Sequence, residues 1–550
     1  EETITFDASL VDETITLNGT QLSIAKPVTI NGDVDDDDTP DITIDANGNS
    51  RVFNIDDGSN DLTVNLNGLT ITGGRGGDGG GIRNKEDLTV SNSIIVGNSA
   101  DDGGGIAAFA GKTRVNNSTL SDNTTSSSGG AIFNGSGIVT VNNSTLSGNT
   151  ATEVGGGIFI RDTTTIYNST ISDNSASNVG GGVFNHPNSS EARITNSTIS
   201  NNVTDLDGGG LFNDGTVNLA NTIISGNTAA NNGNEVRRND GTIESEGNNL
   251  FGDSSQSNSD AFSGFTPENN DLTATSDGTN PTTLDDIIAP LENNGGFTET
   301  NALVTGSPAI DAGDNAQIPP DTLDLDGDGD TDEPIPFDQR GEGFDRVLNG
   351  TVDIGAVEVK NYFFFTDFES GLPPEFSGAG GVESVQDYEG IGGFSGDFLY
   401  NDSTGNPADK TTLTLTDLPA HNFIDLDFLL ATINSWDGSE GGGSPDFFNV
   451  TVDGGTVFSE SLSGEKEMTY EPPEGVVISS GSNLGFLYDD GTPNNDEAYN
   501  LGLDPTFRNI PHTSDTLTIE WFASGRGWQG ENDESWAIDN VRVTLLGEAV

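Results

Sequence analysis

The sequence predicts an all-β protein in which a parallel β-helix is followed by an antiparallel β-sandwich. Three observations predict this class. Glycine and asparagine motifs recur at intervals of 24 to 28 residues in the first half of the chain. The apolar runs between these motifs are short and rich in β-branched residues, which favour strands. The repeat is absent after Lys360, and all four tryptophans lie beyond that residue.

Two markers define the repeat. Glycine clusters begin at Gly79, Gly103, Gly129, Gly155, Gly180 and Gly208. Asn-Ser-Thr motifs or close variants begin at Asn117, Asn143, Asn168, Asn196 and Asn221. Runs this short cannot form stable helices, whereas three short strands and three turns make one coil of a solenoid. We therefore predict stacked coils in which like residues form ladders.

Two kinds of ladder are expected. The phenylalanines that follow the glycine clusters should stack inside the solenoid, and these are Phe133, Phe159, Phe184 and Phe212. The asparagines should occupy turns, because asparagine tolerates left-handed backbone angles and its amides can stack.

Several motifs resemble known bacterial surface proteins. GGAIFN, GGGVFN and GGGLFN resemble the repeats of polymorphic outer-membrane and pectate-lyase-like right-handed β-helix proteins. GSPAIDAGD (Gly306–Asp314), FDQRG (Phe337–Gly341) and VDIGAVE (Val352–Glu358) resemble the choice-of-anchor Q proteins, which are secreted or surface β-helix proteins. The resemblance implies a right-handed β-helix over residues 1–359, with DIGAVE closing its end.

Residues 360–550 are predicted to form the sandwich, of jelly-roll type, because at least seven alternating strand-like runs are separated by turns. Thr366–Glu369 (TDFE) and Ser535–Val541 (SWAIDNV) resemble the ends of MAM and lectin-like bacterial jelly rolls. That resemblance implies a calcium site between the terminal strands, with Glu369 and Asp539 as ligands.

An acidic loop before residue 335 is the sharpest chemical motif. Its carboxylates occupy positions 1, 3, 5, 7 and 9 of a calcium loop, and they belong to Asp324, Asp326, Asp328, Asp330 and Asp332. Gly329 lies at position 6, where the turn requires glycine, but position 12 is Ile335 rather than glutamate. We predict calcium there without flanking helices. A second acidic cluster, residues 33–41, could bind calcium or form an exposed loop.

Composition excludes several function classes. The chain has 88 acidic and 19 basic residues, so its formal net charge is −69. Such a field repels phosphate, which excludes nucleic acid and anionic membranes as partners. The absence of cysteine excludes disulfides, thiol catalysis and iron–sulfur clusters. No apolar run reaches the roughly 20 residues that a membrane span requires.

Aromatic and catalytic candidates are few. Trp436 and Trp528 lie in glycine-rich loops and are candidates for stacking on sugar rings, whereas Trp521 and Trp536 follow a core-like alternation. The three histidines occur singly and the arginines are scattered, without an acid–base set. We therefore expect no enzyme activity.

The predicted function is that of a secreted, calcium-binding structural protein of the bacterial surface, which polymerises with itself head to tail. One alternative is a surface adhesin that binds extracellular glycans. A second alternative is a polysaccharide lyase or hydrolase. The chain begins with Glu1 rather than methionine, from which we expect that a signal peptide has been removed.

Overall fold

A computed structural model of the protein divides into two compact units, Glu1–Val359 and Lys360–Val550. The structure describes residues 2–35, 37–59, 62–187, 191–304, 306–322, 325, 330–348, 350–359, 362–384, 394, 396–416, 418, 421–434, 436, 445–462, 468–473, 475–481, 496–525, 528–530 and 534–546.

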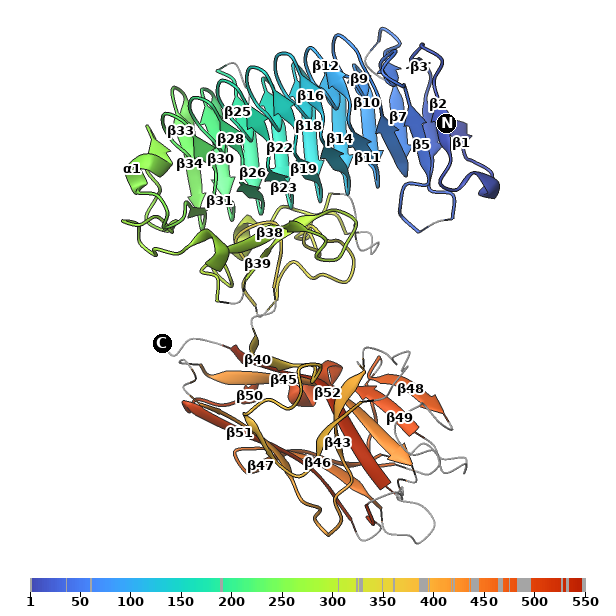
Figure 1. Cartoon of the computed structure of the whole chain (residues 1–550), viewed down its shortest axis with the longest axis vertical. Coiled ribbons are helices and arrows are strands. Elements are labelled where there is room, and N and C mark those ends of the chain that lie inside the picture. The colour runs from blue at the N-terminus through green and yellow to red at the C-terminus, as the bar shows by residue number, and fades with distance from the viewer. Residues whose placement is uncertain are drawn as a thin grey trace. The chain divides into compact units, whose positions relative to one another are not determined.

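The first unit is a parallel β-solenoid with three long sheets and one short sheet (Figure 1). The first solenoid sheet contains, in order, β1 (Glu2–Ile4), β4 (Val28–Asn31), β7 (Thr63–Asn67), β10 (Asp87–Ser91), β14 (Lys112–Asn116), β18 (Ile138–Asn142), β22 (Thr164–Tyr167), β26 (Ala192–Thr195), β30 (Thr216–Ala220) and β34 (Thr242–Gly247). The second contains β2 (Thr14–Thr16), β5 (Ile42–Asp45), β8 (Leu69–Thr72), β11 (Ile94–Val96), β15 (Thr119–Ser121), β19 (Thr145–Ser147), β23 (Thr170–Ser172), β27 (Thr198–Ser200), β31 (Ile223–Ser225), β35 (Leu250–Phe251) and β37 (Leu272–Thr273).

The third solenoid sheet contains β3 (Leu22–Ile24), β6 (Phe53–Ile55), β9 (Ile82–Asn84), β13 (Ile106–Ala108), β17 (Ile132–Asn134), β21 (Ile158–Ile160), β25 (Val183–Asn185), β29 (Leu211–Asn213), β33 (Val236–Arg238) and β36 (Phe262–Ser263). The short sheet contains β12 (Ser99–Ala100), β16 (Thr124–Thr125), β20 (Thr150–Ala151), β24 (Ser175–Ala176), β28 (Val203–Thr204) and β32 (Thr228–Ala229). The other elements of this unit are η1 (Ala8–Leu10), α1 (Asn258–Ala261), η2 (Leu284–Asp286), β38 (Ile288–Glu292), β39 (Thr300–Leu303) and η3 (Asn315–Gln317).

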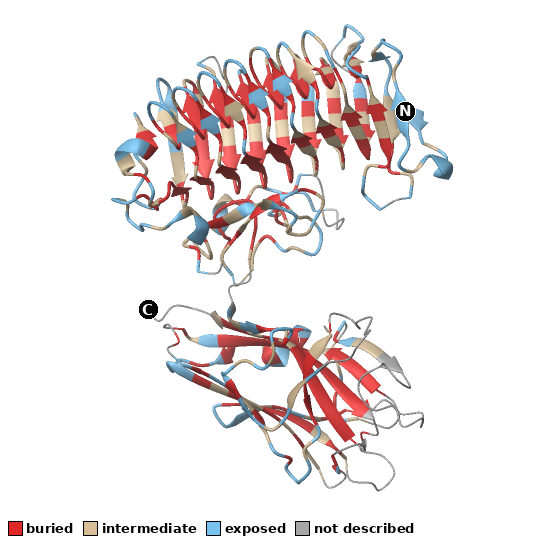
Figure 2. Ribbon diagram, in the orientation of Figure 1, coloured by how far each residue is buried: buried red, intermediate tan, exposed pale blue. Residues whose placement is uncertain are grey.

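The core of the solenoid consists of aliphatic ladders, which form the buried interior in Figure 2. One ladder on the second sheet pairs Leu120 with Leu146, then Ile171 and Ile199, and all four are fully buried. Like residues stack because parallel strands of successive coils pair in register. The prediction that like residues of successive coils form ladders is therefore confirmed.

The phenylalanine ladder is confirmed as a stack, but its predicted place inside the solenoid is wrong. Phe133, Phe159, Phe184 and Phe212 stack with ring centroids 4.7 to 5.5 Å apart. They form a cluster separate from the main core. Successive residues of a strand point to opposite faces, and the preceding aliphatic residue, such as Ile158, takes the inner one. The rings therefore bury one another on the outer face of the third sheet.

A ladder of buried asparagines runs beside the aliphatic core. The side-chain N–H of Asn123 donates to Asn149 Oδ1 at 3.0 Å, and the same bond links Asn149 to Asn174 at 2.9 Å. Each side chain also donates to the carbonyl of an earlier coil, as Asn123 does to Ile95. These bonds satisfy buried polar groups, which otherwise destabilise the fold.

In the last part of the first unit, the described residues between 296 and 358 lie against the solenoid and are here called the strap (Figure 1). The prediction that DIGAVE closes the solenoid end is wrong. Ala356 donates its backbone N–H to Thr198 Oγ1 on the second sheet, so the motif covers a side of the solenoid. The last strands are instead closed by edge-to-face contacts among Phe251, Phe262 and Phe265.

The second unit is an antiparallel sandwich. One sheet has the order β42 (Gly381–Ser384), β43 (Asp397–Asn401), β52 (Glu534–Leu546), β45 (Phe423–Asn434), β49 (Asp496–Asn500) and β48 (Val477–Gly481), joined by β40 (Tyr362–Thr366) and β50 (Ile510–Pro511). The other has the order β41 (Phe376–Gly378), β44 (Thr411–Thr416), β51 (Thr516–Ser524), β46 (Phe447–Val452) and β47 (Gly455–Ser461). Two short helices, η4 (Leu501–Leu503) and η5 (Pro505–Phe507), follow β49.

The core of the sandwich is aromatic. Trp521 on β51 and Trp536 on β52 are fully buried. Trp536 packs edge-to-face against Phe448 at 5.3 Å, which joins the two sheets. The expectation that these two tryptophans belong to the core is confirmed.

Candidate functional site

A groove of about 700 Å³ lies on the solenoid between the turns of three successive coils and the strap. We call it the asparagine groove, and its lining includes Asp37, Asp38, Asn92, Asn117, Asn143, Phe297, Phe337, Arg340 and Glu342. Its wall therefore combines amides and carboxylates with two phenyl rings.

The asparagines of the groove occupy one turn in three coils. Asn92, Asn117 and Asn143 each follow a strand of the first sheet and precede a strand of the second. Their φ values are 47°, 43° and 47°, in the left-handed region that asparagine tolerates better than most residues. The Asn-Ser-Thr repeat is therefore a turn with one asparagine of left-handed backbone per coil, as predicted.

Hydrogen bonds fix two of these amides. The side-chain N–H of Asn117 donates to Asn92 Oδ1 at 2.8 Å. The side-chain N–H of Asn92 then donates to Asp38 Oδ1 at 3.0 Å. Because each amide donates toward the acidic loop, the chain of bonds ends on a carboxylate, which is the stronger kind of acceptor.

Asn143 differs from its two neighbours. It is 5% exposed, and its Oδ1 has no hydrogen-bond partner among the described residues. At the same turn of a later coil both amide atoms have partners: Asn221 donates to Asp314 O and accepts from Asp314 N–H, at 3.0 and 2.8 Å. A buried acceptor without a partner destabilises a protein by about 1–3 kcal/mol. Asn143 thus belongs to the groove lining, but its Oδ1 is buried in the wall rather than open to the groove.

The strap wall is anchored to the solenoid directly below the groove. Gln339 donates to Thr145 Oγ1 at 2.8 Å and accepts from Thr170 Oγ1 at 2.6 Å. Arg340 donates to both carboxylate oxygens of Asp338, to Oδ2 at 2.6 Å and to Oδ1 at 3.1 Å. Its guanidinium also lies over the ring of Phe344, at 4.1 Å from the centroid. The arginine of the groove is therefore fixed and its charge is compensated.

Buried charges hold the rest of the strap together. Arg346 forms a fully buried ion pair with Glu358, with 2.9 Å between nitrogen and oxygen. Glu358 also accepts the backbone N–H groups of Leu348 and Asp353. Burial raises the pKa of Glu358 and of Asp353, and Arg346 opposes the rise. The three motifs that resemble those of choice-of-anchor Q proteins thus lie in the strap and make structural contacts beside the groove.

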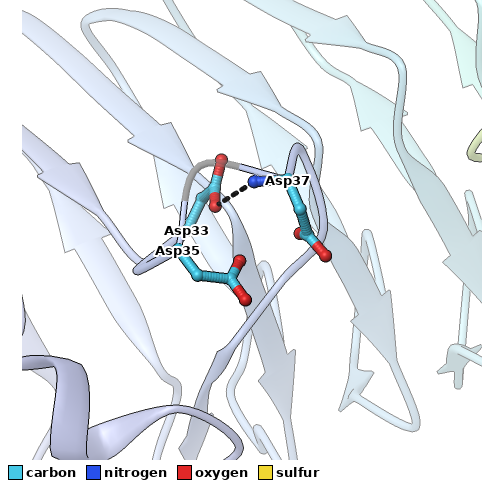
Figure 3. Close-up of side chains that lie close together, drawn as sticks. All are labelled: Asp33, Asp35 and Asp37. Carbon is cyan, nitrogen blue, oxygen red and sulfur yellow. Dashed lines mark hydrogen bonds between the residues drawn. The ribbon is translucent and has the colours of Figure 1, made fainter.

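The acidic loop of residues 33–41 borders the groove. Carboxylate oxygens of Asp33, Asp35 and Asp37 lie within 4.8 Å of one another (Figure 3). Asp33 is 7% exposed and accepts backbone N–H groups of Asp37 and Asp38, both at 3.2 Å. Desolvation is the largest cause that raises the pKa of Asp35, and repulsion from Asp37 is the second. Hydrogen bonds from Thr39 lower the pKa of Asp37.

The predicted calcium loop is only partly described. Asp324, Asp326 and Asp328 lie outside the described residues. Asp330 and Asp332 are exposed, and the Asp332 N–H donates to Asp330 Oδ1 at 3.0 Å. Calcium at this loop stays a prediction.

The carboxylates predicted at the sandwich termini lie near paired strands. β40 pairs antiparallel with β52, with Thr366 opposite Val541. Asp539 is fully buried on β52, and Asn540 donates its N–H to Asp539 Oδ1 at 2.6 Å. Glu369 is exposed and accepts the backbone N–H of Asp397 at 3.0 Å. Calcium between Glu369 and Asp539 also stays a prediction.

The structure buries the two tryptophans predicted to stack on sugars. Trp436 and Trp528 are 5% and 6% exposed and pack edge-to-face at 5.2 Å. Their indole N–H groups donate to Ser535 O at 2.8 Å and to Ser403 O at 3.0 Å. The expectation that these two tryptophans stack on sugar rings is corrected. They lie in glycine-rich segments of the sequence, but their rings pack against each other and are buried.

No protein-family model and no curated protein matches the sequence. Among the described residues, no helix is both long and apolar enough to cross a membrane.

The solved structures with some similarity include a polysaccharide-active enzyme and carbohydrate-binding modules. Pectate lyase Pel9A has a TM-score of 0.36 and 16% identity and covers 63% of this chain and 86% of its own. A xylan-binding family 22 domain from Paenibacillus barcinonensis has a TM-score of 0.19 and 12% identity over 35% of this chain and 100% of its own. A family 22 carbohydrate-binding module from Clostridium thermocellum has a TM-score of 0.19 and 10% identity over 35% of this chain and 99% of its own.

Proposed function

We propose that this chain is a glycan-binding protein of the bacterial surface and that the asparagine groove is its binding site. The observation that carries the proposal is the row of turn asparagines Asn92, Asn117 and Asn143 in the groove lining, two of which are fixed by hydrogen bonds. Sugar hydroxyls both donate hydrogen bonds and accept them, so they suit a row of amides.

The rest of the groove suits the same ligand class. Its volume of about 700 Å³ lies in the range of small-molecule sites. Phe297 and Phe337 give the wall an apolar part, against which the apolar face of a sugar ring packs. The amides of Asn92 and Asn117 are held in one orientation by their own hydrogen bonds, which reduces the entropy lost on binding.

We propose binding without catalysis. The guanidinium of Arg340 is engaged by Asp338 and Phe344, so it is poorly placed to remove a proton as a lyase base does. Reducing-sugar release and unsaturated-product absorbance, measured on the bound glycan, decide between this proposal and a lyase or hydrolase.

The test of binding is a glycan array followed by titration of the best ligand against Asn143→Gly. Glycine accepts the φ of 47° without strain, so the variant removes the amide and keeps the turn. We expect affinity to fall at least tenfold. Asn196→Gly changes the same turn in a coil outside the groove lining and should leave affinity unchanged. Equal affinity of Asn143→Gly and the unaltered protein would contradict the proposal.

Calcium and an extracellular location belong to the proposal. The carboxylate spacing of Asp324 to Asp332 supports calcium at that loop, and the group of Asp33, Asp35 and Asp37 offers a second acidic site. Secretion is checked by fractionating the source cells and locating the protein by antibody.

Self-assembly is the second candidate function, and one observation favours it. Among the described residues the strands of the first coil pair on one side only, and their apolar residues Ile4, Ile15 and Leu22 are 47%, 40% and 37% exposed. An open sheet edge with apolar side chains is a surface on which a further strand can pair. Electron microscopy with and without EDTA is the test, and monodisperse particles in both conditions count against assembly.

A further inference from the structure

The first coil of the solenoid leaves one end of the hydrophobic core open. Ile15 and Leu22 pair in register with Ile44 and Phe53 of the next coil, so their side chains point into the same interior. Ile44 and Phe53 are 3% and 1% exposed, whereas Ile15 and Leu22 are 40% and 37% exposed (Figure 2). The terminal coils of a solenoid need a polar outer face or a cover, because apolar core surface in water is unfavourable.

The backbone of the same coil limits what can serve as that cover. β1, β2 and β3 lie at the ends of the three long sheets and pair on one side only among the described residues. Their open edges surround the apolar centre. A single peptide strand can pair with one edge, but it leaves the other two edges and the centre in water. A second solenoid end brings three strand edges and an apolar centre together.

The opposite end of this solenoid does not offer such a surface. Phe251 and Phe262, near its last strands, are 0% and 9% exposed and pack edge-to-face against Phe265. Ala261 of the short helix α1 is fully buried against the same core. The solenoid end that matches the first coil is therefore the first coil of another copy of this chain.

We infer that two copies of this chain associate through their first coils, like end against like end, in a closed dimer. The inference rests on the second candidate function, self-assembly, and specifies its geometry. A contact between like ends uses up its own surface and stops at two copies, whereas a head-to-tail contact continues into a filament. Glycan binding in the asparagine groove is independent of this contact.

The charges around this end predict how the dimer responds to salt. Glu2, Asp12 and Glu13 are exposed on the first coil, and a second copy brings the same carboxylates near them. Lys26 is exposed on the same coil and makes no ion pair among the described residues, so it can pair with a carboxylate of the second copy. Since the carboxylates outnumber the lysine, the dimer should tighten as salt rises to about 0.5 M and screens their repulsion.

Sedimentation analysis of the full chain over a range of concentrations tests the inference. EDTA is present, so that calcium cannot bridge acidic loops of two copies. We expect monomers and dimers in equilibrium and no larger species. Ile15→Glu with Leu22→Glu places charges in the contact and should raise the dissociation constant about a hundredfold or more, as expected for anchors at the centre of an interface.

Val203→Glu with Leu206→Glu is the matched control. These side chains are 46% and 41% exposed on a later coil, so the variant adds the same two charges away from the first coil. It should leave the dissociation constant within about twofold of that of the unaltered protein. Circular dichroism melting of both variants checks that the fold is kept.

Cross-linking reads the orientation of the contact directly, because the chain contains no cysteine. Thr16→Cys places one exposed thiol on the first coil, and Ser259→Cys places one on α1 near the other end. A homobifunctional maleimide should join two copies of Thr16→Cys and leave Ser259→Cys monomeric. The variant with both thiols should again give dimers and no longer chains.

Each other outcome overturns the inference in a recognisable way. Monomers at every concentration overturn it together with self-assembly. A dimer that Ile15→Glu with Leu22→Glu leaves intact, and that Thr16→Cys does not cross-link, uses another surface. Long cross-linked chains from the variant with both thiols, without dimers of Thr16→Cys, indicate head-to-tail assembly. The glycan array reports on the groove separately, so failure of the dimer and failure of glycan binding are distinguishable.

Discussion

Asn227 donates its side-chain N–H to Glu235 Oε2 at 2.6 Å, at the point where the inner asparagine ladder ends. The backbone N–H of Asn227 donates to the same oxygen at 3.3 Å. Earlier members of the ladder make this pair of bonds to the next amide, as Asn202 does to Asn227 Oδ1 at 2.9 Å. Glu235 therefore replaces an asparagine side chain by a fully buried carboxyl. Burial raises the pKa of Glu235 to about 8.

From this carboxyl we predict that the solenoid loses stability as the pH rises from mildly acidic to mildly basic. The folded pKa of about 8 is higher than the 4.5 of an unfolded glutamate, so the folded state holds the proton more tightly. The contribution is complete below the unfolded pKa and is lost as pH rises through the folded pKa. In that interval the free energy of unfolding should fall by about 1.4 kcal/mol per pH unit for one such group.

Thermal melting from pH 5 to pH 9 measures this effect. The melting temperature of Glu235→Gln should fall less steeply with rising pH than that of the unaltered protein, because the neutral amide has no proton to lose. Part of the slope should remain, since burial also raises the pKa of Glu358 and Asp353. Parallel melting profiles for the variant and the unaltered protein would show that Glu235 does not titrate in this range.

The outer phenylalanine stack predicts a large loss of stability from one truncation. Phe159 is 7% exposed and stacks between Phe133 and Phe184, at 4.7 and 5.4 Å. Phe159→Ala should lower the free energy of unfolding by about 3–5 kcal/mol, as burial and ring contacts are lost together. Leu206→Ala, at a side chain 41% exposed in the same unit, should change it by less than about 1 kcal/mol. Similar denaturation midpoints for the two variants would contradict the packing.

The sequence was sufficient to predict the coils but not the side of the sheet on which the phenylalanines lie. The repeat near 25 residues predicts stacking, because like positions of successive coils must pair. In an Ile-Phe pair such as Ile158 and Phe159, either residue could face inward by hydrophobicity alone, and only the width of the interior decides. Here the smaller aliphatic residue occupies the interior.

The asparagine groove was beyond sequence reasoning for another reason. The Asn-Ser-Thr motif gave the turn, but all its copies look alike. Asn143 differs from Asn221 because the strap gives partners to both amide atoms of Asn221, whereas Asn143 Oδ1 has none among the described residues. The strap contacts join residues far apart in sequence, such as Thr170 and Gln339, and no local pattern reports such pairs.

From the ion pair of Arg346 and Glu358 we predict that the stability of the strap depends on the buried guanidinium of Arg346. Both side chains are at most 1% exposed. Arg346→Met leaves a buried carboxyl without its partner and should destabilise the first unit by about 3–5 kcal/mol. Limited proteolysis should then cut within the strap, and glycan binding should weaken because the strap forms one wall of the groove. Adding Glu358→Gln should restore part of the loss.

Arg193→Met is the matched control for that prediction. Arg193 pairs with Glu246 at 2.6 Å, but the two side chains are 34% and 30% exposed. A pair open to water to this extent contributes about 0–1 kcal/mol. Equal proteolysis of the two variants would mean that the strap is held by its backbone contacts rather than by Arg346.

Calcium binding predicts that the melting temperature rises with millimolar calcium. Bringing five carboxylates within nine residues is unfavourable unless a cation lies among them, so calcium should stabilise the folded loop of Asp324 to Asp332. At ten times the dissociation constant the gain is about 1.4 kcal/mol for one site.

Asp326→Asn with Asp328→Asn should abolish the response if this loop is the site. Asp35→Asn with Asp37→Asn should abolish it instead if the cation is held by the cluster of Figure 3. A melting temperature that calcium leaves unchanged in the unaltered protein argues against both sites, and magnesium at the same concentration controls for simple screening of the −69 charge.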